Sequence, residues 1–301
     1  MFKIDNNHSL NSELGVFTKT IYHYTSYDVL PVFFEPSADL YCTKAQWLND
    51  PTEVLAGAYG FAKWLYSSGV LSESRYRLLL TNIRETIGQD WFDLWVMSLS
   101  SENDDLPQWR GYTSREHGGY AIGFNVNKLV RALSKITQIE LSEGGGSANK
   151  IPFLVRCWYT KQDSLLIESL YKDIFLKYAN DFVVYDSSPS LDAEKIRAVI
   201  SSIMTASMHI KDDGFRSEKE ARIALTVPGC NYNDKKILGG KPRMPVGIPL
   251  LGEPLHTYID LICISPHGDR DALKNQVERL KVESGASFLI QESVIPYDSS
   301  R

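Results

Sequence analysis

The segment Phe215–Val227 most constrains how this chain folds, because its side chains alternate with the two-residue period of a β-strand. The apolar members, which would share one face, are Ala221, Ile223, Leu225 and Val227. The charged members, which would share the other face, are Glu218, Glu220 and Arg222. Two carboxylates and a guanidinium beside a core-forming strand are typical of a catalytic cleft. The alternative is an edge strand with a solvated charged face.

Composition favours a globular protein: 43% of the 301 residues are hydrophobic and 23% are charged. The net charge of -5 argues against an extended basic surface for duplex nucleic acid, although a local basic groove remains compatible with it. The N-terminus lacks the pattern of a signal peptide, and no apolar run is long enough to cross a bilayer. The four cysteines are scattered and form no CxxC pair. We therefore expect a cytoplasmic protein without membrane association or a bound metal.

Periodicity and turn residues predict an α+β fold with a split, mixed or antiparallel sheet as its core. Residues 1–18 are expected to be a loose lead-in, and residues 19–301 a single domain with a helical insertion at about 163–212. Strands are expected at 21–25, 40–43, 94–100, 119–124, 153–159, 220–227, 258–265 and 287–294. Helices are expected at 50–66, 72–87, 127–136, 165–176, 191–208 and 269–282. The Gly- and Pro-containing stretch 229–249 is expected to be a long connection.

Three groups of residues outside this strand are candidates for function. His23 lies in the first expected strand, where a histidine is more often structural than functional. Ser98 and Ser100 are two residues apart and share a strand face, so they could orient a carboxylate or simply end the strand. Trp109 and Tyr112 could form an aromatic wall that stacks on a ring, or could belong to the core. The chain has no P-loop, no dinucleotide-binding glycine motif, no GxSxG elbow and no HExxH.

The order of several short motifs resembles a known family. From the N-terminus these are YHYT, LNDPTE, SLS with a following WxxY, GGYAIGF, SEKEARIAL, ICISP and SVIPY, which together cover roughly residues 21–297. This pattern resembles the bacterial domain of unknown function 2971 family. Phe215 stands where that family often has Trp, and Asp298 where Arg is frequent.

The layout further resembles the ADP-ribosyltransferase superfamily, whose members carry a His or Arg on the first strand, a hydroxyl-bearing strand next, and a catalytic Glu on a later one. The resemblance implies an enzyme that takes NAD as its substrate and passes ADP-ribose to an unknown acceptor in nucleic acid or protein, as a toxin or antiphage effector. It implies catalytic roles for Glu220, which would stabilise charge beside the ribose, for Glu218, which would act on the acceptor, and for His23. The residues implied to contact NAD are His23, Tyr24, Thr25, Ser98, Ser100, Trp109, Arg110, Tyr112 and Arg222.

Two other functions remain open from the residues themselves. A metal-dependent nuclease would use Asp50, Glu53, Glu218 and Glu220 as Mg²⁺ ligands. A non-catalytic module that senses a ligand or partner would use the acidic strand as a contact surface.

Overall fold

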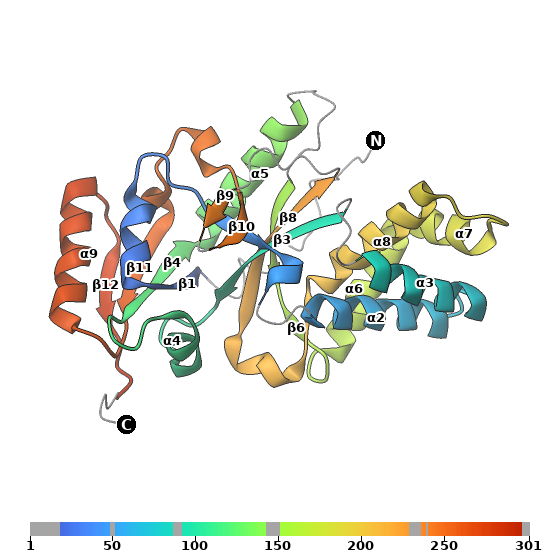
Figure 1. The fold of residues 1–301 in the computed structure, drawn as a ribbon, viewed down its shortest axis with the longest axis horizontal. Coiled ribbons are helices and arrows are strands. Elements are labelled where there is room, and N and C mark those ends of the chain that lie inside the picture. The colour runs from blue at the N-terminus through green and yellow to red at the C-terminus, as the bar shows by residue number, and fades with distance from the viewer. Residues whose placement is uncertain are drawn as a thin grey trace.

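The structure is a computed structural model. It describes residues 19–48, 52–86, 92–142, 151–228, 236–238 and 240–296. Its fold is α+β, as predicted, and is built on one mixed sheet (Figure 1). The expected lead-in at 1–18 and the first two residues of the helix expected at 50–66 lie outside the described residues.

Ten strands of the described chain form the large sheet, and a separate pair, β6 and β7, lies beside it. The ten are β1 (Thr20–Ser26), β2 (Tyr41–Lys44), β3 (Phe92–Ser100), β4 (Gly119–Asn125), β5 (Ile151–Arg156), β8 (Glu220–Pro228), β9 (Lys236–Leu238), β10 (Lys241–Pro245), β11 (Ile259–Ile264) and β12 (Leu289–Glu292). The small pair consists of β6 (Trp158–Tyr159) and β7 (Ile210–Lys211). Only β11 and β12 pair in parallel within the large sheet, so the sheet is mixed, as predicted.

The large sheet forks at β3. One edge of β3 pairs with β8 along its whole length, from Phe92 opposite Pro228 to Ser100 opposite Glu220. The other edge is shared by two strands, because β2 pairs at Trp95 and Val96 whereas β1 pairs only at Ser100. Residues 97–99 of β3 therefore lie between β1 and β2 without a strand partner on that edge, and the sheet is open there.

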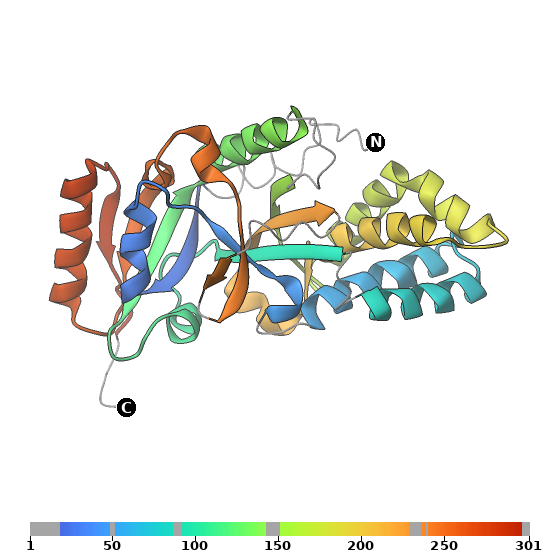
Figure 2. The same ribbon diagram turned by 45° about the horizontal axis from the view of Figure 1, so that its top comes forward.

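Helices cover both faces of the sheet and extend beyond one end. They are α2 (Thr52–Ser67), α3 (Glu73–Thr86), α4 (Leu106–Tyr112), α5 (Val126–Ser142), α6 (Ser164–Lys177), α7 (Ala179–Ser187), α8 (Ala193–Ser207) and α9 (Arg270–Ser284). Figures 1 and 2 show α2, α3, α6, α7 and α8 as a helical lobe at one end of the sheet, with α9 at the opposite end. No helix in the described segments is long and apolar enough to cross a bilayer.

Two apolar cores lie on opposite faces of β3 and β8. Ala221 and Ile223 belong to the core that also contains α5 side chains, whereas Ala224 belongs to the core of the helical lobe. The alternation predicted for this strand is confirmed, but the solvated edge strand offered as its alternative is wrong. Because β8 has partners on both edges and helices over both faces, its charged side chains are buried rather than solvated.

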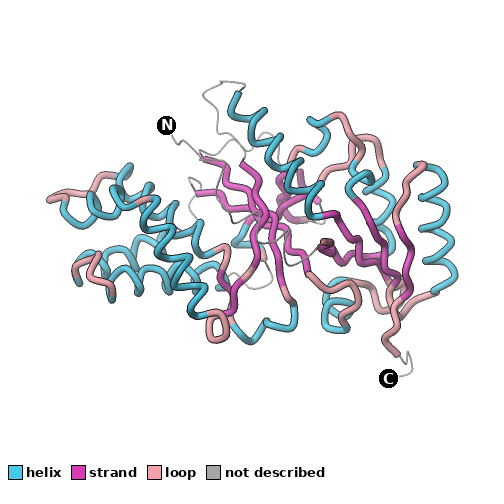
Figure 3. The backbone as a smooth tube through the Cα atoms, turned by 180° about the vertical axis from the view of Figure 1, so that it is seen from behind, coloured by secondary structure: helices cyan, strands magenta, loops and turns pink. Residues whose placement is uncertain are grey.

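Three element predictions need correction. The expected connection at 229–249 contains β9 and β10, which form an antiparallel hairpin and extend the sheet from β2. The strand expected at 153–159 breaks at Cys157 into β5, which pairs with β8, and β6, which pairs with β7. The helical block between β6 and β7 contains an additional helix, α7. Figure 3 shows from behind how the strands lie between the helical lobe and α9.

Candidate functional site

The turn before β8 holds two acidic side chains in a way that a continuous strand would not. The predicted strand from Phe215 begins only at Glu220, because residues 213–218 form a 3-10 helix. Lys219 between them has φ 43° and ψ 50° and is the only non-glycine residue with positive φ among the described residues. This left-handed conformation costs an L-residue about 1–2 kcal/mol, and such strain concentrates at functional sites. Glu218 therefore does not share a strand face with Glu220.

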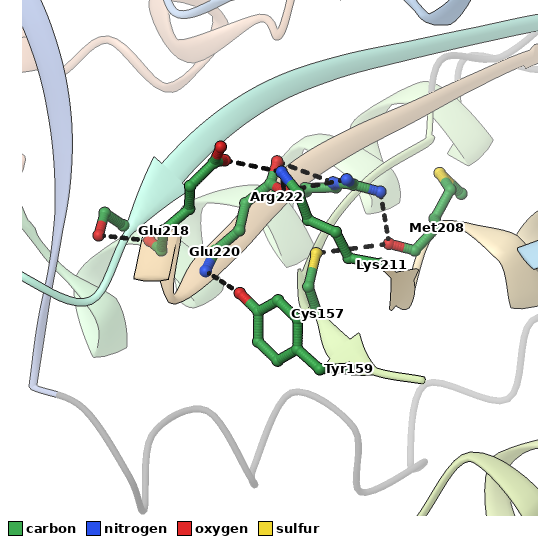
Figure 4. Close-up of polar contacts among 8 residues, drawn as sticks. Cys157, Tyr159, Met208, Lys211, Glu218, Glu220 and Arg222 are labelled. Atoms are coloured by element: carbon green, nitrogen blue, oxygen red, sulfur yellow. Dashed lines mark hydrogen bonds and ion pairs between the residues drawn. The ribbon is translucent and has the colours of Figure 1, made fainter. Parts of the chain in front are cut away.

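Lys211 nevertheless brings the two carboxylates together (Figure 4). Its Nζ donates to Glu218 Oε2 at 2.7 Å and to Glu220 Oε2 at 2.6 Å. Arg222 binds Glu220 with two donors, Nε to Oε1 and Nη2 to Oε2, both at 2.9 Å. Its Nη1 donates to the Met208 carbonyl at 3.2 Å. These four side chains, Lys211, Glu218, Glu220 and Arg222, are called the ionic cluster below.

Burial divides the ionic cluster into an inner and an outer part. Arg222, Glu220 and Lys211 are 0%, 4% and 3% exposed, whereas the Glu218 side chain is 23% exposed. Both oxygens of Glu220 accept hydrogen bonds from within the cluster, but Oε1 of Glu218 accepts none from the described residues. Glu218 is therefore the carboxylate that can accept a hydrogen bond from a bound molecule.

The charges around Glu220 keep it ionised. Burial by itself raises the pKa of Glu220, but the charges and hydrogen bonds of Arg222 and Lys211 outweigh it and lower the pKa to about 2. Two hydroxyls fix the backbone nearby: Ser100 Oγ donates to the Glu218 carbonyl at 2.8 Å, and Tyr159 OH accepts from the Glu220 N–H at 2.9 Å. Ser100 was expected to brace the Glu220 carboxylate, and it instead holds the backbone of Glu218.

Three members of the ionic cluster, Lys211, Glu218 and Glu220, line a groove of about 650 Å³ at the point where the sheet forks. Ser98 of β3 and His23 of β1 also line it. Burial lowers the pKa of His23 to about 4, although a hydrogen bond to the Ser98 backbone opposes the shift. The ring is therefore neutral near neutral pH. A groove of this size matches those that hold cofactors and other small ligands.

The structure places the predicted residues in three groups. Six line the groove, namely His23, Tyr24, Ser98, Tyr112, Glu218 and Glu220. Arg222 and Ser100 lie behind its wall and support Glu220 and Glu218. The remaining three, Trp109, Thr25 and Arg110, do not line the groove. Trp109 is 0% exposed and donates its Nε1–H to Asp104, Thr25 is buried in β1, and Arg110 is exposed on α4 outside the groove.

The groove also contains cationic and aromatic residues that sequence reasoning missed. Lys211 follows a helix in a two-residue strand, where no local pattern marks it. Arg243 and Lys241 lie in the stretch expected to be a connection, and both line the groove. Their spacing of two is the one signal that could have indicated a shared strand face. The aromatic lining residues missed are Tyr22, Tyr41, Trp47 and Phe215.

Of the four residues suggested as Mg²⁺ ligands, the structure describes the side chains of Glu218 and Glu220. Asp50 and the side chain of Glu53 lie outside the described residues. Within the described segments, no group of three or more His, Cys, Asp or Glu side chains is placed to hold a metal. A cation at Glu220 would have to displace Lys211 or Arg222, which already neutralise it.

Comparison with known proteins supports the family resemblance. Residues 108–223 match the model of a family described as "Protein of unknown function (DUF2971)". The matched region runs from α4 into β8 and includes all four residues of the ionic cluster. No curated protein matches the chain. No solved structure matches it either.

Proposed function

We propose that the groove binds NAD and that the protein is an ADP-ribosyltransferase-like enzyme, which transfers ADP-ribose to an acceptor in nucleic acid or protein. One observation carries the proposal: two carboxylates, of which Glu220 is held ionised, and a neutral histidine lie in the wall of one groove at the fork of the sheet, although they come from segments distant in the sequence. A split sheet with these residue types in this chain order is the layout that such an enzyme needs. A role as a toxin or antiphage effector belongs to the same proposal.

The chemistry requires an anion beside the ribose. Nicotinamide leaves NAD as a neutral molecule, and the ribose carbon that it leaves develops oxocarbenium character, which a nearby carboxylate stabilises. Glu218 lines the groove and its Oε1 accepts no hydrogen bond from the described residues, so we assign it the contact with the ribose. Glu220 is less accessible and acts through Lys211, whose ammonium it shares with Glu218. This assignment moves the ribose contact from Glu220, where the sequence placed it, to Glu218.

Other groove residues supply binding rather than charge. The neutral His23 ring has one N–H, which its hydrogen bond to the Ser98 backbone uses, so the other ring nitrogen can accept a hydrogen bond from a ribose hydroxyl or from the amide of nicotinamide. Tyr112 is 38% exposed at the groove and offers a face for stacking on a base or nicotinamide ring. Tyr24 lines the groove but its hydroxyl is engaged, since it donates to the Glu102 carbonyl and accepts from the Asp105 N–H. Tyr24 therefore contributes its ring edge alone.

The decisive experiment follows both products of the reaction. Purified protein is incubated with NAD labelled in the adenylate half, together with separate pools of DNA, RNA and protein. Release of nicotinamide with label transfer to one pool supports the transferase and identifies the acceptor class. Release of nicotinamide with free ADP-ribose and no transfer indicates a glycohydrolase. If nicotinamide is not released with any pool, the enzymatic proposal is wrong.

A non-catalytic nucleotide-binding module is the second candidate. The observation that favours it is charge balance, because the two carboxylates of the ionic cluster face two cations and the cluster is formally neutral. Such a cluster stabilises a developing positive charge less than a lone carboxylate does. NAD binding in calorimetry without nicotinamide release, unchanged in Glu218→Gln, would favour this module over the enzyme.

A further inference from the structure

The end of the groove formed by β2 and β10 carries two cations. Lys241 and Arg243 are two residues apart on β10, so their side chains share one face of that strand. Arg243 is directly opposite Thr43 of β2, and Thr43 is opposite Val96 of β3. Because register partners point to the same side of a sheet, Arg243, Thr43 and Val96 form one row across the groove. All three line it.

These two cations differ from Lys211, which also lines the groove. Lys211 is neutralised by Glu218 and Glu220. Neither Arg243 nor Lys241 forms an ion pair with a carboxylate of the described residues. Arg243 donates from Nη1 to the Thr43 hydroxyl, and Lys241 Nζ donates to the Trp47 carbonyl at 3.3 Å. The remaining donors of the guanidinium are available to a ligand.

Desolvation adds a second argument for a ligand at Arg243. The side chain is half-buried, and this burial lowers the pKa of its guanidinium. Taking a cation out of water without an anionic partner costs free energy, and a bound anion offsets that cost. Guanidinium groups bind carboxylate or phosphate oxygens with two parallel hydrogen bonds. With Lys241 beside Arg243, the two cations suit a diphosphate, which carries more charge than a single carboxylate.

We propose that the β2–β10 end of the groove is a diphosphate subsite, in which Arg243 and Lys241 bind the phosphates of a nucleotide diphosphate while Tyr41 and Trp47 border its base. The subsite is inferred from the positions of Arg243 and Lys241 alone. The orientation of NAD that follows from it rests on the proposed function. In that orientation the diphosphate lies at β10, and the nicotinamide ribose lies toward Glu218. The two cations at this end of the groove and the accessible carboxylate of Glu218 elsewhere in its lining favour that direction of NAD.

The test uses ligands that lack nicotinamide, so it is independent of turnover. Inorganic pyrophosphate and ADP are titrated into the full-length protein in a calorimeter. Both are expected to bind, and higher salt is expected to weaken them. Arg243→Gln is expected to weaken ADP by about 10- to 100-fold, the effect of one charge-assisted contact. Lys241→Gln is expected to weaken it less, because a lysine binds phosphate as a point charge.

Two further variants serve as controls. Arg131→Gln removes the same charge from the exposed face of α5 and should leave ADP affinity unchanged. Arg243→Lys keeps the charge without the planar fork and should bind with intermediate affinity. If Arg243→Gln does not fold, Lys241→Gln together with Arg243→Lys carries the test. Equal ADP affinity in these variants and wild type, or no binding of ADP and pyrophosphate to wild type, would overturn the subsite.

The two proposals fail in different ways. If NAD is never consumed but ADP binds through Arg243, the subsite holds and the enzymatic function is wrong. If NAD is consumed but ADP affinity is unchanged in the Arg243 and Lys241 variants, the function holds and the subsite is wrong.

Discussion

Lys211 Nζ lies 2.6 Å from Glu220 Oε2, and this contact joins the helical lobe to the central sheet. Lys211 ends β7, which follows the helices of the lobe, whereas Glu220 begins β8. Both side chains are at most 4% exposed, so the charges depend on each other and on Arg222 rather than on water. Removing one member of such a buried pair leaves the other charge buried without a partner, which is strongly destabilising.

Replacing Lys211 with Met is expected to destabilise the fold strongly. The substitution leaves Glu220 with one cation and Glu218 with none, and breaking a buried pair costs about 3–5 kcal/mol. The free energy of unfolding from urea denaturation measures the effect. The control is Lys172→Met, which removes a surface ion pair with Glu168 (2.9 Å) and should cost less than about 1 kcal/mol. Equal costs for the two variants would show that the Lys211 contacts are not formed in solution.

Amide substitution of the two acids of the ionic cluster is expected to affect different properties: stability at Glu220 and NAD turnover at Glu218. Glu220→Gln removes the charge that two buried cations require, so it should lower stability by a few kcal/mol. Glu218→Gln keeps the shape of a half-buried side chain and should change stability by less than about 1 kcal/mol. If Glu218 contacts the ribose, that variant should lose NAD turnover by about 100-fold or more while it still binds ADP. Parallel urea denaturation and nicotinamide-release assays separate the two effects. Full turnover in a folded Glu218→Gln variant would refute its catalytic role.

The buried His209 predicts a pH dependence of stability. Desolvation, together with the charge of Arg222, lowers the pKa of His209 from 6.5 to about 4. Below pH 6.5 the unfolded chain takes up a proton that the folded protein does not, so stability is lost as the pH falls from 6.5 toward 4. His209→Gln should reduce this slope, whereas His117→Gln, at an exposed position, should not. Urea denaturation across that pH range measures how the free energy of unfolding depends on pH. An unchanged slope in His209→Gln would show that His209 is not the source of this dependence.

Local patterns predicted the fold well and the candidate site only in part. The two-residue periodicity identified β8 from Glu220 on, because the apolar and charged side chains of consecutive residues alternate along this strand. The same rule failed at Glu218, because Lys219 has a left-handed backbone conformation that the presence of a lysine does not predict. Lys211 and Arg243 were missed for a different reason. Their importance comes from pairing between segments distant in sequence, which no window of the chain contains.

Trp109 shows the opposite error, in which a residue that looked like a ligand contact is structural. Its spacing from Tyr112 suggested a shared wall, but on the short helix α4 the two rings diverge: Trp109 is packed against Tyr24 with centroids 4.7 Å apart, and Tyr112 is 38% exposed. Burial of the indole is possible because Asp104 accepts its N–H. Sequence could not distinguish the two rings, because the partner of each depends on how α4 packs on β1.

Asp104 is expected to stabilise the groove by fixing α4 and the segment after β12. Its Oδ1 accepts from Trp109 Nε1 at 2.8 Å and from Ser293 Oγ at 2.6 Å, and its Oδ2 accepts from the Val294 N–H at 2.9 Å. Asp104→Ala leaves a buried indole N–H without a partner, which costs about 1–3 kcal/mol. Asp104→Asn keeps one oxygen acceptor and should cost less. Urea denaturation ranks the two variants, and limited proteolysis should cleave near Val294 sooner in Asp104→Ala. Equal stability of the Ala variant and wild type would show that this anchor is not formed.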